Sequence, residues 1–322
     1  MIKTFRYLLA LLALALASIV GAQEPFPSKP VRIVVMFAVG GASDIMARLA
    51  GPRLTEIWGQ QVVIDNRAGA DGRIAMEHVA KSAPDGYTLL IIDPSYVIVP
   101  ALFAKLPVDI QRDFVPVAML GKAPQVLVAH PSLPVKSMAE LIALAKERPG
   151  TLNFASPGTG SAGHLAGELL RTLTKASFVH VPYKGAGPAL NDLLAGQVSF
   201  AFVSVASALS NVKAGKLRAL GVTSPERFSA LPDTPSLDEA GVKGFDTNQW
   251  WGIMAPAGTP RAIVAKLNTD FIKAVNGAEA RERIAAMGAE VYTTTPEATG
   301  IFLASEMNKW GKIIRDAGTK VE

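Results

Sequence analysis

Apolar runs alternate along the chain with segments whose apolar positions recur at helical spacing. Residues 31–36 (VRIVVM) form a β-rich apolar run typical of a strand buried on both faces, and a helix is predicted from about Asp44 to Trp58. Further strands are predicted near residues 61–64, 88–92, 114–119, 125–129, 151–154, 178–181, 198–203, 217–222 and 249–254. This alternation predicts an α/β protein with largely parallel sheets covered by helices on both faces.

The N-terminal 22 residues have a different pattern. Lys3 and Arg6 precede an uncharged apolar run of fourteen residues, 7–20, and a small-residue site (VGA) ends at Ala22. This order is typical of a secretory signal peptide over residues 1–22, with cleavage predicted after Ala22. A membrane anchor is the alternative, but the run is shorter than the roughly 20 apolar residues that a spanning helix needs. We therefore expect an exported, periplasmic protein.

Composition narrows the classes of function. The chain has 322 residues and no cysteine, which excludes disulfides, thiol catalysis and Cys-ligated metals. Lys and Arg number 32 against 27 Asp and Glu, and the resulting charge of +5 is spread along the chain. Nucleic-acid binding needs clustered basic residues, so we expect no nucleic-acid partner. The length predicts about two domains.

Two glycine-rich loops each follow a predicted strand and precede a predicted helix. They are residues 40–44 (GGASD) and residues 156–164 (SPGTGSAGH). The backbone N–H groups of such loops, together with the positive end of a helix dipole, offer hydrogen bonds and charge to an anion. A plain turn capped by Ser43 or Asp44 is the alternative for the first loop. Two loops of one design in separate parts of the chain indicate a cleft that binds a small carboxylate.

Sequence signatures of enzymes are incomplete. Gly158, Gly160 and Gly163 match the dinucleotide pattern G-x-G-x-x-G, but no acidic residue ends the next predicted strand, as that pattern requires. The histidines lack the spacing of metal ligands. Ser161 lies one glycine short of a nucleophile elbow, so a hydrolase that uses Ser161 with His164 is a weak alternative. We therefore expect no enzyme activity, no metal and no cofactor.

A series of further motifs runs through the chain after residue 22. They are residues 27–35 (PSKPVRIVV), 66–70 (NRAGA), 83–90 (APDGYTLL), 180–185 (HVPYKG), 214–220 (AGKLRAL) and 255–260 (APAGTP). Each motif is weak alone. Their order and spacing, together with the two glycine loops, closely resemble the Bug-type extracytoplasmic solute receptors of the tripartite tricarboxylate transporter family.

The resemblance implies a fold like that of type II periplasmic binding proteins, in which two α/β lobes are joined by crossing strands with a ligand cleft between them. Lobe one is expected over residues 23–124 and 247–322, and lobe two over residues 125–246. The implied function is to capture a small organic carboxylate and deliver it to the membrane subunits of a transporter. A monomer is expected, and a sensor kinase is the alternative partner, in a signalling system.

The resemblance also implies ligand contacts from both lobes. Those in lobe one are Phe37, Gly40, Gly41, Ser43, Asp44, Asp93 and Ser95. Those in lobe two are Gly158, Thr159, Gly160, Ser161, His164 and Ser204. Relatives often carry Asp or Asn near Ser204, and Asp93 disfavours a second carboxylate beside it. We therefore expect a monocarboxylate, or an aromatic or amide-bearing acid, rather than citrate.

Overall fold

The computed structural model describes residues 26–317 apart from 38, 104, 159, 184 and 185. The predicted signal peptide and its cleavage site, and Thr159 of the second glycine loop, lie outside the described residues. Within the described part of the chain, no helix combines the length and apolar character that crossing a membrane requires.

Lobe one is built on a sheet whose centre is β1 (Val31–Val35). This strand pairs in parallel with β2 (Val62–Asn66) and with β3 (Thr88–Ile92). One face of the sheet packs on α2 (Ala42–Trp58), α9 (Arg261–Asn276) and α10 (Ala278–Ala286). The other packs on α3 (Arg73–Ala80), α4 (Ser95–Leu102) and α11 (Pro296–Ala317), and a short 3-10 turn, η1 (Ala70–Gly72), precedes α3. The buried apolar run at 31–35 thus forms a strand covered on both faces, as predicted.

Lobe two repeats this plan with other strands. Its β5 (Asn153–Ser156) pairs in parallel with β6 (Val179–Pro182) and with β7 (Phe200–Ser204). One face packs on α5 (Met138–Glu147) and α6 (Ala162–Thr174), and the other on α7 (Ala186–Leu194) and α8 (Val205–Lys213). In both lobes a glycine loop therefore leads from the end of a buried parallel strand into a helix.

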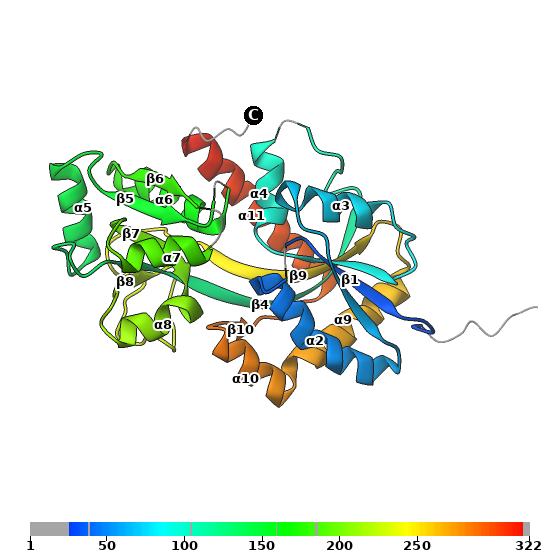
Figure 1. Ribbon diagram of the computed structural model, residues 1–322. Coiled ribbons are helices and arrows are strands. Elements are labelled where there is room, and N and C mark those ends of the chain that lie inside the picture. The colour runs from blue at the N-terminus through cyan, green and yellow to red at the C-terminus, as the bar shows by residue number, and fades with distance from the viewer. Residues whose placement is uncertain (1–25, 38, 104, 159, 184–185, 318–322) are drawn as a thin grey trace, which may run out of the picture.

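Two long strands cross between the lobes. They are β4 (Phe114–Ala129) and β9 (Asn248–Pro256), which run antiparallel to one another (Figure 1). Residues 114–124 of β4 pair with β9, and from Gln125 onward β4 pairs with β7 and with β8 (Arg218–Val222). A short β10 (Glu290–Val291) adds to the β4 edge in lobe one. The expected architecture of two α/β lobes joined by crossing strands is confirmed.

Two predictions about the sheet were wrong. Only the outer strands of each lobe are parallel, because every pairing made by β4 and the pairing of β3 with β9 are antiparallel. The strands predicted at 114–119 and 125–129 are one strand. Pro124 is the last residue paired with β9, so its missing N–H lies where β4 changes partners.

Helix α11 packs against the crossing strand β4 and against both lobes. It contacts α4 in lobe one, α6 in lobe two, and β4 between them. The buried carboxylate of Glu306 accepts hydrogen bonds from the indole N–H groups of Trp250 on β9, at 2.9 Å, and of Trp310, at 3.1 Å. Lys309 pairs with the other oxygen of this carboxylate. A single buried acid thus joins the C-terminal helix to a crossing strand.

Candidate functional site

The first glycine loop connects β1 to the start of α2. Gly40 has a φ of +86°, which favours glycine, and Gly41 is the N-cap residue of α2. Because Gly41 has no side chain, it supplies no cap to the helix amides. The prediction that Ser43 or Asp44 caps this helix was wrong, because both side chains are bonded elsewhere. The first turn of α2 therefore presents its amides without a side-chain cap at the N-cap position.

Asp44 holds the first loop from inside. Its carboxylate accepts the N–H of Gly40 at 2.9 Å and the Nε of Arg48 at 3.0 Å. Burial alone would raise the pKa of Asp44, but hydrogen bonds from Arg48, Gly40 and Asn66 outweigh it and keep that pKa below its usual value. Arg48 also donates to Asn66 Oδ1 at 3.1 Å, and Asn66 donates to the carbonyl of Phe37 at 3.0 Å. Asp44 therefore acts as the anionic anchor of the loop.

Ser43 and Asp93 connect this loop to the one after β3. Ser43 Oγ donates to Asp93 Oδ2 at 2.9 Å, and the N–H of Ser95 donates to Asp93 Oδ1 at 2.9 Å. Both side chains are buried. Burial raises the pKa of Asp93, while these hydrogen bonds act in the opposite direction. The predicted residues of lobe one are thus brought together, with Asp93 behind the loop rather than on its surface.

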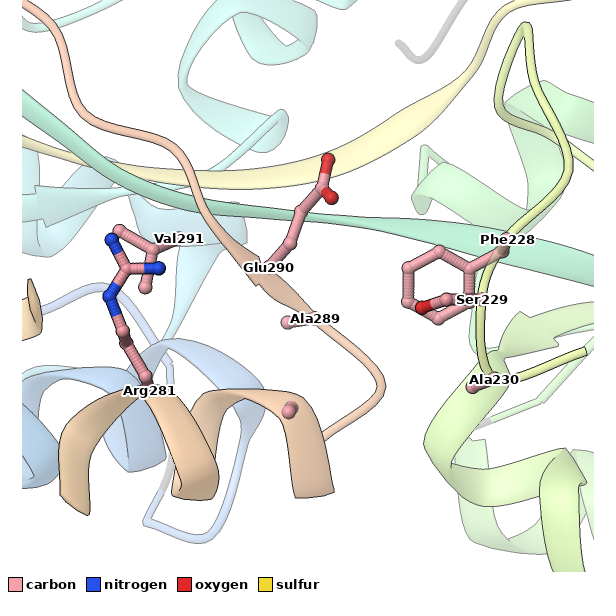
Figure 2. A pocket seen from close by; sticks show the side chains of 8 residues that line it. Phe228, Ser229, Ala230, Arg281, Ala289, Glu290 and Val291 are labelled. Atoms are coloured by element: carbon pink, nitrogen blue, oxygen red, sulfur yellow. The ribbon is translucent and has the colours of Figure 1, made fainter. Parts of the chain in front are cut away.

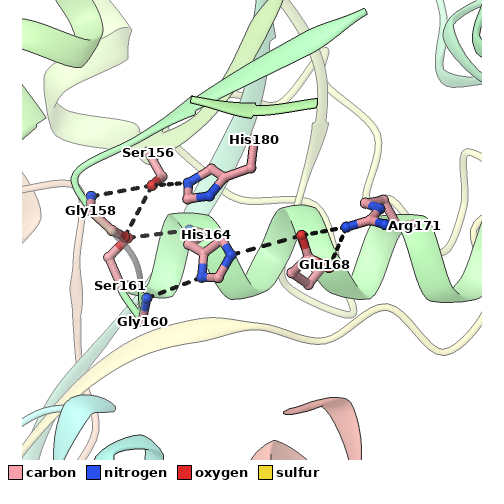
Figure 3. A network of polar contacts seen from close by, with 8 residues as sticks. All are labelled: Ser156, Gly158, Gly160, Ser161, His164, Glu168, Arg171 and His180. Atoms are coloured by element: carbon pink, nitrogen blue, oxygen red, sulfur yellow. Dashed lines mark hydrogen bonds and ion pairs between the residues drawn. The ribbon is translucent and has the colours of Figure 1, made fainter. Parts of the chain in front are cut away.

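The second glycine loop precedes α6 and is fixed by its own side chains (Figure 3). Ser161 is the N-cap residue: its Oγ accepts the N–H of His164 at 3.3 Å and donates to the carbonyl of Gly158 at 2.7 Å. The N–H of Gly160 donates to His164 Nδ1 at 3.0 Å. Gly160 itself has a φ of +80°. The loop therefore folds back on the first turn of α6, with its hydroxyl and imidazole groups satisfied internally.

Two stacked histidines lie beneath this loop. The rings of His164 and His180 are 4.1 Å apart and inclined by 26°. His180 Nε2 lies 2.6 Å from the hydroxyl of Ser156, which accepts the N–H of Gly158 at 3.2 Å. Burial lowers the pKa of each imidazole to about 4, so both are neutral near pH 7. Each neutral ring thus holds one part of the loop.

His164 faces protein groups at both ring nitrogens. Nδ1 accepts from Gly160, and Nε2 lies 3.8 Å from Glu168 Oε1, whose carboxylate is paired with Arg171 at 2.8 Å. The side chain is 4% exposed, which places it under the loop. Ser161 Oγ donates to a carbonyl and not to this ring. The pair therefore lacks the nucleophile–base hydrogen bond that a serine hydrolase requires.

The two lobes touch beside the second loop. A Cβ atom placed on Gly160 would lie only 3.0 Å from Cδ1 of Leu102, at the end of α4 in lobe one. Ser204, the remaining predicted residue, is exposed and is the N-cap of α8, accepting the N–H of Ser207 at 3.3 Å. Ser204 also pairs in register with Gln125 of β4. The sequence-predicted residues thus form one cluster in each lobe, with Leu102 and Gly160 at the contact.

Sequence reasoning did not nominate several supporting residues. They are Arg48, Asn66, Leu102, Gln125, Ser156, Glu168 and His180. Asn66 and His180 both lie in motifs that support the family resemblance. Their place in these motifs was the sequence feature that could have identified them. Ser156 belongs to the second glycine loop, and Arg48 and Glu168 lie one helical turn from Asp44 and His164. Leu102 and Gln125 act through contacts between elements that are distant in the sequence, which no local pattern reveals.

A pocket of about 400 Å³ lies away from both glycine loops. Phe228, Ser229 and Ala230 from the loop after β8 face Arg281, Glu290 and other residues of the α10–β10 segment across it (Figure 2). One wall therefore comes from each lobe, so the pocket is a second place where the lobes approach one another.

The chain is similar to known solute receptors. Residues 46–319 match the family of tripartite tricarboxylate transporter receptors. Protein BugT of Bordetella pertussis is 38% identical over 301 residues, which cover 93% of this chain and 92% of that protein. Rpa4515 of R. palustris, solved with adipate, is 37% identical, with a TM-score of 0.82 over 91% of this chain and 98% of that one. MatC of Rhodopseudomonas palustris, solved with malate, is 35% identical, with a TM-score of 0.79 over 90% and 100%.

Proposed function

The chain belongs to the receptor family of tripartite tricarboxylate transporters, and from this premise we propose that it binds a small organic carboxylate between its lobes and presents it to the membrane subunits of such a transporter. The observation that carries the proposal is the pair of glycine loops, one in each lobe, that lead from parallel strands into the N-termini of α2 and α6. Each terminus favours an anion by its free amides and its dipole. The two structures solved with adipate and with malate support the ligand class.

We assign the ligand contacts to the loops and the supporting roles to the side chains behind them. Gly40, Gly41, Gly158, Gly160 and Ser161 line the ligand site, and the N–H groups of Gly40, Gly158 and Gly160 are bonded to Asp44, Ser156 and His164. The second tier holds these loops in place and consists of Ser43, Asp44, Asp93 and His164. Phe37, Ser95, Thr159 and Ser204 complete the proposed lining of the cleft. Closure over the ligand needs no chemistry, because a ligand that contacts both loops stabilises the closed state.

The boundaries of the lobes follow the pairing of β4. We propose lobe one over residues 23–124 and 247–322 and lobe two over residues 125–246. This division is supported by the change of partner between Pro124, which pairs with β9, and Gln125, which pairs with β7. Export to the periplasm with cleavage after Ala22, and a monomeric state, are part of the same proposal. A sensor kinase is the alternative partner.

The ligand carries one carboxylate at the loops, and a neutral group at its other end is favoured over further carboxylates such as those of citrate. The buried Asp93 disfavours a second full negative charge nearby. Arg48, the cation beside the first loop, is engaged by Asp44 and Asn66. We therefore expect a monocarboxylate, or an aromatic or amide-bearing acid, to bind more tightly than citrate. Rpa4515 and MatC were solved with the dicarboxylates adipate and malate.

Two measurements test the proposal. Native mass spectrometry of protein purified without refolding weighs any retained ligand, and titration calorimetry measures the affinity for hexanoate, malate, adipate and citrate. We expect micromolar or tighter binding of at least one acid by the wild type, and weaker binding by the Ser161→Ala variant. Tight citrate binding with no binding of the others contradicts the proposed ligand. Hydrolysis of esters that disappears in Ser161→Ala would instead support an enzyme.

A further inference from the structure

Gln125 carries a polar side chain at the point where β4 passes from one lobe to the other. Its backbone is fully paired with Thr223: its N–H donates to Thr223 Oγ1 at 2.8 Å and its carbonyl accepts the N–H of Thr223 at 2.9 Å. The residue is 8% exposed, and its Oε1 atom is buried without a hydrogen-bond partner among the described residues. Buried amide oxygens are rarely left unpaired in native proteins, so an unpaired Oε1 at this position is unusual.

The Gln125 side chain lies beside the starts of two helices. A Cβ atom on Gly163, in the first turn of α6, would lie 3.8 Å from Gln125 Nε2 and 2.8 Å from the carbonyl of Phe202. Helix α6 therefore packs directly on β7 at this point, where the carbonyl of Phe202 leaves room only for glycine, and the amide of Gln125 lies within ordinary contact distance of the same position. Gln125 also stands opposite Ser204 in the register of β4 and β7. Paired residues of antiparallel strands point to the same face, so the exposed N-cap of α8 lies next to it.

We propose that Gln125 is a specificity residue, whose carboxamide hydrogen-bonds a second polar group of the ligand while the first carboxylate occupies the glycine loops. This inference rests on the proposed carboxylate-binding function. The unpaired Oε1 accepts a hydrogen bond from a hydroxyl or amide group, and after a turn of the amide Nε2 donates to a carboxyl oxygen. Ser204, on the same face, offers a hydroxyl to the same group. The ligand class is therefore a carboxylate that carries a second hydrogen-bonding group.

Thr247 Oγ1, Asn248 Oδ1 and Trp251 Nε1 are likewise buried without a partner among the described residues, but they belong to residues 247–251 at the start of β9 and not to the start of α6. The pocket between residues 228–230 and α10 has Glu290 paired with Lys122 and Arg281 bonded to Asn276. Among the described residues, Gln125 has a buried unpaired acceptor and lies beside the N-terminus of α6, the helix that follows the second glycine loop.

A matched series of six-carbon acids tests the inference. Hexanoate, adipate and the monoamide of adipic acid share one carboxylate and differ only in the group at the far end. Titration calorimetry of the full chain without its first 22 residues gives the dissociation constant of each acid for wild type and for Gln125→Met, which keeps the side-chain length and loses the amide. We expect Gln125→Met to weaken adipate and monoamide binding about tenfold or more, and hexanoate binding by less than about twofold.

Two further variants keep the outcome interpretable. Gln60→Met makes the same change at a glutamine beyond the end of α2 and should alter none of the three affinities. Gln125→Glu keeps the shape and an acceptor, and should weaken adipate more than the monoamide by like-charge repulsion. If Gln125→Met has a much lower melting temperature than the wild type, Gln125→Glu replaces it as the test variant.

The results separate the inference from its premise. Equal affinity losses for hexanoate and adipate in Gln125→Met, or no loss at all, overturn the role of Gln125 and leave carboxylate binding intact. A wild-type protein that binds none of the three acids overturns the proposed function, and the role of Gln125 with it.

Discussion

The residues beneath the second glycine loop matter because they are neutral. His164 accepts a loop N–H at Nδ1, which an imidazolium cannot do, and His180 shares a hydrogen bond with Ser156. Protonation of His164 therefore breaks its bond to Gly160, and the two stacked rings repel one another once both are protonated. The arrangement of the loop depends on a protonation state that burial imposes.

These two imidazoles contribute one part of the pH dependence of stability. Because their pKa values fall from 6.5 to about 4 on folding, the unfolded chain takes up protons first as the pH drops. Their contribution to stability is therefore complete above pH 6.5 and is lost progressively between pH 6.5 and about 4. We expect urea unfolding to show this loss in wild type and a smaller loss in His180→Gln. The matched variant His130→Gln, at a half-buried histidine whose ring contacts Ser132, should keep the wild-type slope. Equal slopes for all three proteins contradict this account.

Gly41 is the position where added charge should act on the ligand alone. Its φ of −71° and ψ of 162° are open to any residue, so substitution there strains no backbone. An aspartate at this N-cap places a carboxylate among the amides assigned to the ligand. We expect Gly41→Asp to weaken adipate binding at least about tenfold, and the uncharged, equally large Gly41→Asn clearly less, with unchanged melting temperatures. Equal losses in the two variants would indicate bulk rather than charge.

Single residues were predictable from the sequence only where local chemistry defined them. The glycine loops stood out because strand, glycines, hydroxyls and helix start are adjacent in the chain. Asn66, His180 and Gln125 did not, because each acts on a segment tens of residues away. The capping prediction for Ser43 and Asp44 failed for a related reason: Asp93 and Arg48 provide stronger partners than the helix amides.

At the scale of elements, the interface of α11 with β9 depends on one buried carboxylate. Glu306 is 5% exposed and accepts from the indoles of Trp250 and Trp310, while Lys309 neutralises its charge. Removing the acceptor leaves two buried N–H groups unpaired, and each such group costs about 1–3 kcal/mol. The C-terminal helix is therefore held by a polar contact as well as by its apolar face.

The matched pair Glu306→Leu and Glu306→Gln tests this contact. We expect Glu306→Leu to lower the free energy of unfolding by about 2–5 kcal/mol, since both indoles lose their acceptor. Glu306→Gln keeps one acceptor oxygen and should lose clearly less. Urea unfolding followed by tryptophan fluorescence measures both. A glutamine variant as unstable as the leucine variant would show that charge pairing with Lys309 dominates.

Most elements followed from periodicity, and the exceptions share a cause. The apolar runs at β1, β3 and β7 and the helical pattern of α2 are local patterns, and the structure places elements there. The apolar pattern predicted two separate strands, 114–119 and 125–129. Long-range pairing with β9, which extends to Pro124, makes them one strand, β4. The two-residue β10 exists only by pairing with β4. Long-range pairing decides these cases.

For the whole molecule, the crossing strands connect two lobes that also approach one another away from the glycine loops. The pocket between Ser229 of lobe two and Arg281 of lobe one has a wall from each. Any rotation about β4 and β9 that closes the glycine loops on a ligand must therefore change this distance as well. The absence of cysteine from the sequence allows two labels to be introduced at chosen positions without background.

A spin-label pair at Ser229→Cys and Arg281→Cys should report closure. Both residues are exposed, so the labels should leave the fold intact. We expect the distance distribution, measured by pulsed electron resonance, to shift when adipate or another bound acid is added. The control pair Arg53→Cys and Arg281→Cys lies within lobe one, on α2 and α10, and should stay unchanged. A shift in both pairs would indicate rearrangement inside lobe one. Constant distances in both pairs, at ligand concentrations that calorimetry shows to be saturating, would mean that the lobes bind the acid without rotating about the crossing strands.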